Sequence, residues 1–181
     1  MALIHMTPDN YIVSQWSGGT TTQVAIAPEG AVYAARDFLW RISSATVDLE
    51  ESDFTPLQGV ERYITPLEGS FVLAHPGAAP VMLPPLAPPY RFWGDVPTHC
   101  VGRATDFNLM LKGCEGTMEL HRSTAPIRPG FNAFYAVEDA VFSLERQQFE
   151  MKKGELLTIF SEENATLEMG ASPALTCWVK I

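Results

Sequence analysis

Two arginines stand in segments that alternate as β-strands do, and each has the chemistry to recognise an anion. In residues 40–47 (WRISSATV) alternate side chains share a face, so Arg41 and Ser43 point the same way beside the small Ala45. A planar guanidinium suits bidentate binding of a carboxylate. Arg62 follows a turn at Gly59, near the start of another strand. The pattern predicts a carboxylate-binding face; surface arginines or structural ion pairs are the alternative.

The segment 106–111 (DFNLML) carries polar side chains on one face of a predicted strand. One face is apolar, and the other consists of Asp106, Asn108 and Met110. Such a two-faced strand is common where the polar face meets solvent. In a barrel wall with both faces covered, the polar groups need partners, because unpaired buried polar groups are costly. Upstream, residues 92–95 (FWGD) add an aromatic wall, Phe92, and an acid, Asp95. Asp95 or Asp106 would serve as a general base in an enzyme.

The segment 16–22 (WSGGTTT) predicts a tight turn. Gly18 and Gly19 are followed by hydroxyl side chains from Thr20 onward, and backbone N–H groups in such a turn can meet an anionic or carbonyl group. No lysine follows the glycines, so this is not a phosphate-binding P-loop. A plain hairpin turn that feeds a threonine-rich strand is the alternative.

Composition excludes several classes of function. A net charge of −9, with 12 basic against 21 acidic residues, disfavours nucleic acid and anionic membrane surfaces. No segment approaches the roughly 18 apolar residues of a membrane span, and the first ten residues do not resemble a signal peptide. The four histidines lack the close spacing of a metal site, so we expect neither metal nor cofactor. Three scattered cysteines fit reduced thiols, and we expect a cytoplasmic protein.

The apolar pattern has period two far more often than 3.6, which predicts an all-β fold with little helix. Glycine and proline punctuate the gaps, as in a sandwich, jelly roll or barrel. The one helix expected covers residues 138–148. Six of the fourteen prolines fall in residues 76–89, which therefore cannot form a central strand. The expected strands cover residues 11–16, 20–27, 38–49, 64–67, 71–75, 106–112, 117–121, 141–144, 156–160 and 175–181.

Five motifs in order resemble the HutD/Ves family. They are WxGGTT at 16–21, WRISxATV at 40–47, DFTxLxGVxR at 53–62, FxGD at 92–95 and DFNLM at 106–110. The resemblance covers about the first two-thirds of the chain. It implies a cupin-like (RmlC-like) double-stranded β-helix, or jelly-roll barrel, in a soluble bacterial protein. It also implies a link to histidine utilisation or to stress, with no established reaction and a proposed role in binding an intermediate such as formylglutamate or urocanate.

We therefore expect residues 1–181 to form one compact unit of the cupin-like kind, with two fused halves joined or covered by a connection or surface loop at 76–89 as the alternative. The expected function is binding of a small carboxylate metabolite, and a homodimer is plausible. A metal-independent isomerase or hydrolase, and an interaction module that uses the proline-rich segment, are the alternatives. The expected binding residues are Trp16, Gly18, Gly19, Thr20, Arg41, Ser43, Arg62, Phe92, Asp95, Asp106, Asn108 and Met110.

Overall fold

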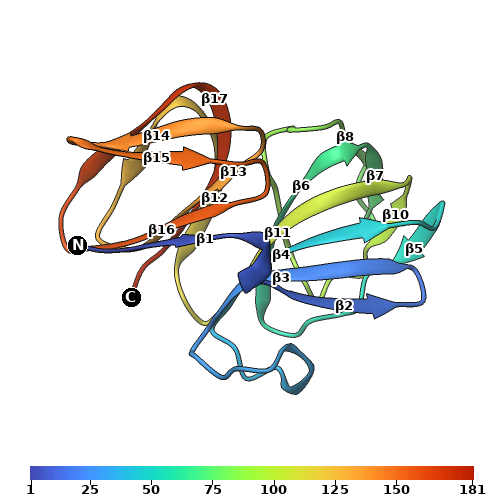
Figure 1. The fold of residues 1–181 in the computed structure, drawn as a ribbon. Helices are drawn as coiled ribbons and strands as arrows, with labels where there is room; N and C mark the ends of the chain where they lie inside the picture. Colours follow the sequence, from blue (N-terminus) through green and yellow to red (C-terminus); the bar gives the residue numbers. More distant parts are fainter. The chain divides into compact units, whose positions relative to one another are not determined.

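The computed structural model describes all residues 1–181 and is built almost entirely of β-strands (Figure 1). The chain divides into two compact units. One is the continuous segment Tyr11–Gly113, and the other combines Met1–Asn10 with Cys114–Ile181. The expected all-β class is confirmed, and each unit is described by itself below.

The unit Tyr11–Gly113 contains two antiparallel sheets. The six-stranded sheet has the order β2 (Ile12–Trp16), β3 (Gly19–Ala27), β4 (Trp40–Val47), β11 (Ala104–Lys112), β6 (Val60–Gly69), β9 (Tyr90–Trp93). The four-stranded sheet has the order β5 (Glu51–Asp53), β10 (His99–Val101), β7 (Phe71–Ala74), β8 (Val81–Leu83). Side chains from both sheets, among them Ile64, Leu73 and Phe92, form one buried apolar cluster.

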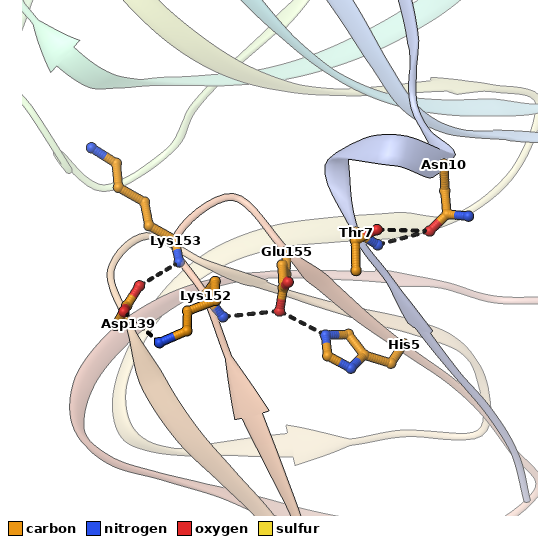
Figure 2. Close-up of polar contacts among 7 residues, drawn as sticks. All are labelled: His5, Thr7, Asn10, Asp139, Lys152, Lys153 and Glu155. Carbon is orange, nitrogen blue, oxygen red and sulfur yellow. Dashed lines mark hydrogen bonds and ion pairs between the residues drawn. The ribbon is translucent and has the colours of Figure 1, made fainter.

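The other unit is a seven-stranded antiparallel sheet. Its order is β1 (Ala2–Met6), β16 (Leu156–Ser161), β13 (Gly130–Ala136), β17 (Ala165–Val179), β14 (Ala140–Leu144), β15 (Gln147–Met151), and β12 (Gly116–Ile127) also pairs with β17. Phe134, Phe142 and Leu157 belong to its buried core. Glu155 ties β1 to a turn: its carboxylate accepts from the Lys152 backbone N–H at 2.9 Å and lies 2.8 Å from His5 Nε2 (Figure 2).

The helix expected at 138–148 is wrong, because this segment forms the β14–β15 hairpin. Leu144 pairs with Gln147 across a two-residue turn, in which Glu145 has a φ of 54°. Phe142 and Leu144 are buried, while the intervening and flanking residues are more exposed, as the alternation of a strand requires. The segment thus follows period two on both sides of its turn, as strands do.

The proline-rich segment 76–89 lies within the unit Tyr11–Gly113. It contains β8, an edge strand of the four-stranded sheet bounded by Pro80 and Pro84. An edge strand tolerates neighbouring prolines because one side of its ladder needs no donors. Ala87 is buried, and its carbonyl accepts a hydrogen bond from Thr65 Oγ1 at 2.7 Å. The segment therefore covers part of its own unit.

Two short 3-10 turns are the only helical elements, so the structure holds no helix with the length and apolarity that a membrane crossing requires.

Candidate functional site

A cavity of about 320 Å³ opens within the unit Tyr11–Gly113, on one face of the six-stranded sheet. Strand register builds its floor. Arg41 on β4 and Arg62 on β6 both pair with Met110 on the intervening β11, and Ser43 lies beside Asn108 one pleat further along. The lining residues are Ser14, Trp16, Thr21, Tyr33, Arg41, Ser43, Ala45, Val47, Ser52, Asp53, Phe54, Thr55, Arg62, Asp106, Asn108 and Met110.

Arg41 forms one side of the cavity and is only 5% exposed. Its Nε donates to Gln23 Oε1 at 2.9 Å, and one terminal nitrogen donates to Ser43 Oγ at 3.2 Å. The guanidinium carbon lies 4.3 Å from the centre of the Tyr33 ring, which provides a cation–π contact. Burial lowers the pKa of Arg41, but an arginine stays protonated in proteins. None of these partners is an acid.

Arg62 is 6% exposed and lies between two aromatic rings. Its guanidinium carbon is 4.7 Å from the centre of Phe54 and 5.1 Å from that of Phe92. Nη2 donates to Asn108 Oδ1 at 2.9 Å, whereas the buried Nε has no hydrogen-bond partner. Burial lowers the pKa of this group as well. A buried unpaired donor is uncommon and destabilising, because the group has lost water without gaining a partner.

Asp106 is the one buried acid of the cavity, at 3% exposure. Its Oδ1 accepts a hydrogen bond from Asn108 Nδ2, and its carboxylate also accepts from the backbone of Ala45. Burial raises the pKa of Asp106 to about 7, because the loss of solvent outweighs the attraction of Arg62. The cavity therefore holds two cations and an acid that is about half ionised at neutral pH.

The rim carries a second, solvated acid. Asp53 on β5 lines the cavity, and its Oδ1 lies 2.8 Å from Nδ1 of His99 on the neighbouring β10. The hydrogen bond to Asp53 raises the pKa of His99 above its ordinary value. The Asp53 side chain is 85% exposed, so water screens its charge from the two buried arginines.

The structure brings seven of the twelve predicted residues to the cavity: Trp16, Arg41, Ser43, Arg62, Asp106, Asn108 and Met110. Phe92 lies behind the wall, in contact with Arg62. Asp95 is exposed beyond the end of β9 and lines no part of the cavity. Thr20 precedes the lining residue Thr21 on β3 and so faces the other side of the sheet.

Gly18 and Gly19 shape the wall without lining it. A Cβ on Gly18 would lie 2.2 Å from the Trp16 ring, so the ring occupies the space that glycine leaves. Gly19 has a φ of 150°, and a Cβ there would lie 1.9 Å from the Thr46 carbonyl oxygen. The pair allows a close approach of the β2–β3 turn to β4 and seats Trp16 at the cavity.

Sequence reasoning missed residues of two kinds. Ser14 and Thr21 lie across from each other on β2 and β3, and alternation from Trp16 and Gly19 predicts their shared face. Tyr33, by contrast, begins the short 3-10 helix η2 (Tyr33–Ala35) between β3 and β4, and the β5 residues belong to a strand of only three residues. No periodic signal marks such segments.

The arrangement has the chemistry to hold a small anion. No three histidine, cysteine or acidic side chains gather as metal ligands would, and no histidine lines the cavity. The two guanidiniums supply charge and donors, Ser43 and Asn108 supply neutral hydrogen-bonding groups, and Trp16, Tyr33 and Phe54 supply apolar walls.

A family model described as HutD matches residues 9–177. A search of curated proteins finds no match. Among solved structures, a conserved protein of unknown function from Pseudomonas aeruginosa PAO1, PA5104, has a TM-score of 0.86 at 21% identity, with 100% of both chains covered. HutD from Pseudomonas fluorescens SBW25, determined in a formate condition, has a TM-score of 0.81 at 20% identity, covering 99% of this chain and 100% of that one.

More distant structures share the architecture. The bacterial pirin YhhW from Escherichia coli, solved in complex with nickel(II), has a TM-score of 0.66 at 8% identity, with 99% of both chains covered. At these identities the likeness concerns the fold alone, and it confirms the expected cupin-like class.

Proposed function

Because the chain belongs to the HutD family and folds as a cupin-like protein with two buried arginines in one cavity, we propose that it binds a small carboxylate metabolite. The observation that carries this proposal is Arg62, whose Nε is buried without a partner beside the cavity that Arg41 also lines. An anion between the two guanidiniums would complete the site.

Charge balance supports an anionic ligand. Taking an arginine out of water is costly unless an opposite charge compensates it. Here two buried arginines share a single buried acid, Asp106, which is itself partly protonated near neutral pH. A bound carboxylate supplies the missing negative charge and accepts charge-assisted hydrogen bonds.

Cavity size supports a metabolite rather than a larger ligand. A volume of about 320 Å³ is near the lower end of the range of about 300–1,000 Å³ for small-molecule sites. Intermediates of histidine degradation such as formylglutamate and urocanate are of this class, and we propose that their binding tunes histidine utilisation.

A thermal-shift panel tests the proposal, with formylglutamate, urocanate, formate, histidine and glutamate as probes. A ligand at 100 times its dissociation constant adds about 2.7 kcal/mol, which should raise the melting temperature by roughly 5–10 °C. Arg41→Ala should weaken binding by about tenfold or more, since a hydrogen bond to a charged group contributes roughly 1.5–3 kcal/mol.

Arg91→Ala is the matched control, because Arg91 is 61% exposed on β9 and pairs with Glu61 away from the cavity. It should leave the affinity unchanged. Equal affinity in wild type and Arg41→Ala, with both proteins folded, would rule out the proposed site.

Asp106 favours one second candidate, a metal-independent isomerase or hydrolase. A buried carboxyl with a pKa of about 7 is suited to act as a general base at neutral pH. The enzyme hypothesis expects turnover of a panel compound that Asp106→Asn abolishes while binding survives. Asp95 lies outside the cavity and does not share this support.

A further inference from the structure

We propose that the cavity takes up its carboxylate together with one proton, and that Asp106 holds this proton and donates a hydrogen bond to the bound carboxylate. This inference rests on the proposed function and gives Asp106 the role of an acid in the complex. One proton moves from solvent to an Asp106 oxygen, and no covalent bond to the ligand forms or breaks.

Shared burial is the first argument. Asp106 lines the same cavity as Arg41 and Arg62 and is 3% exposed, so water cannot screen it from an anion bound there. Two carboxylates in one small cavity repel each other, and a proton on Asp106 removes this repulsion while the charges of Arg41 and Arg62 remain for the ligand. A protonated acid also forms a short, strong O–H···O⁻ bond to its neighbour.

The hydrogen bonds of Asn108 orient the polar groups around Asp106. Arginine only donates, so the Asn108 oxygen faces Arg62 Nη2 and its amide nitrogen faces Asp106 Oδ1. The Asp106 carboxylate accepts from Asn108 and from the Ala45 backbone N–H, so both neighbours are donors and neither can take the proton from Asp106. Asn108 also stands between Arg62 and Asp106, which leaves the charge of Arg62 available to a ligand.

Other groups that face Asp106 do not replace it as the proton acceptor. Arg41 on β4 and Arg62 on β6 stay charged, and Tyr33, in the short 3-10 helix η2 (Tyr33–Ala35) before β4, lines the same cavity. Burial raises the pKa of Cys100 on β10 to about 12, so its thiol keeps its proton. Asp53 and its partner His99 lie exposed at the rim.

The direction of the pH dependence follows. Free Asp106 has a pKa of about 7, and a bound anion raises the pKa further. Below this pH the acid is already protonated and binding takes up no proton. Above it each binding event takes up one, so affinity falls with rising pH by up to about tenfold per unit.

Isothermal titration calorimetry with formylglutamate as the probe measures this uptake. Titrations at about pH 8 in HEPES and in Tris, whose ionisation enthalpies differ, give the number of protons bound; we expect a value approaching one, and near zero at about pH 6. Asp106→Asn, a neutral mimic of the acid, should bind without proton uptake and with little pH dependence. Asp95→Asn, at an exposed position outside the cavity, is the matched control and should keep the uptake.

Each result has a distinct meaning. Wild-type binding without proton uptake at pH 8 overturns this inference and leaves the proposed function intact, as does uptake that persists in Asp106→Asn. No binding to wild type at either pH overturns both. Should Asp106→Asn not fold, infrared difference spectra of wild type decide: a protonated carboxyl band must appear on binding at pH 8, and its absence refutes the inference.

Discussion

At the scale of residues, the site is a chain of three side chains from two neighbouring strands, Arg62, Asn108 and Asp106. Asn108 accepts from the cation and donates to the acid, so a neutral amide connects groups that otherwise form an ion pair. Burial holds the pKa of Asp106 near neutral pH against the lowering effects of Arg62 and Asn108, and the Nε of Arg62 stays without a partner. The raised pKa of Asp106 and the unpaired Nε of Arg62 both follow from burial of these side chains on the cavity face of the sheet.

Asp106 should make the stability of the free protein depend on pH. Its pKa is raised from an ordinary 3.8 to about 7 in the folded state, so its contribution is fully present below pH 3.8 and is lost as pH rises through 7. Urea unfolding across this range should show wild type losing stability relative to Asp106→Asn, by an amount on the order of 4 kcal/mol. Asp95→Asn should show no such trend; a parallel loss in Asp106→Asn would contradict the prediction.

At the scale of elements, two hairpins show how turn chemistry sets register. In the β2–β3 turn, Gly18 leaves space for the Trp16 ring and Gly19 allows a close approach to β4. The β14–β15 turn instead places Glu145 in the left-handed region, at a φ of 54°, where side chains other than glycine, asparagine and aspartate are disfavoured. The first turn positions Trp16 at the cavity, whereas the second holds Glu145 in a strained backbone conformation.

Replacing Glu145 with glycine should therefore stabilise the protein. Glycine adopts positive φ without steric cost, and relief of the strained conformation should exceed its added chain entropy, for a net gain of up to about 1 kcal/mol. Thermal or urea unfolding measures the change. Glu150→Gly, in the middle of β15, is the control and should destabilise; a loss of stability in Glu145→Gly would argue against a two-residue turn here.

Gly18→Ala should affect ligand binding. The backbone of Gly18 is not in the left-handed region, so the collision with the Trp16 ring dominates the effect. The ring must move from the cavity wall, and the affinity for a carboxylate should fall several-fold with a change in tryptophan fluorescence. Ser17→Ala, at the adjacent exposed position, should change neither quantity.

The sequence predicts elements where the pattern is periodic. Alternation placed Arg41 and Ser43 on one face, and Asp106, Asn108 and Met110 on one face, because a strand has a fixed period of two. Their adjacency depends on the register of β4, β11 and β6, which no local pattern specifies. Tyr33 reaches the cavity from the short 3-10 helix η2 (Tyr33–Ala35), which no periodic pattern marks, and the segment expected as a helix forms two short strands joined by a turn.

At the scale of the whole molecule, each of the two units has its own buried core. All lining residues of the cavity belong to the unit Tyr11–Gly113, so its binding chemistry can be assigned to a continuous stretch of chain. The cysteines are distributed over both units, and they offer a simple probe of how closed the folded protein is.

One thiol should react in the native protein and three after denaturation. Cys100 and Cys177 are buried and burial raises the pKa of both thiols, whereas Cys114 is only half-buried. Because the thiolate is the reactive form, a colorimetric disulfide reagent should label Cys114 first. Cys114→Ser should abolish the fast phase; rapid reaction of two or more thiols would mean that a core is open.

Strand β1 has a consequence for how the protein is made. Ala2 pairs with Phe160 and Met6 with Leu156, and His5 meets the carboxylate of Glu155 (Figure 2). During synthesis the first strand must therefore wait, unpaired, while the unit Tyr11–Gly113 is completed and the later strands emerge from the ribosome. Pairing of β1 with β16 closes a loop of about 150 residues, which is a slow and non-local event. A nascent chain halted before residue 156 would leave the edge of β1 exposed to other chains.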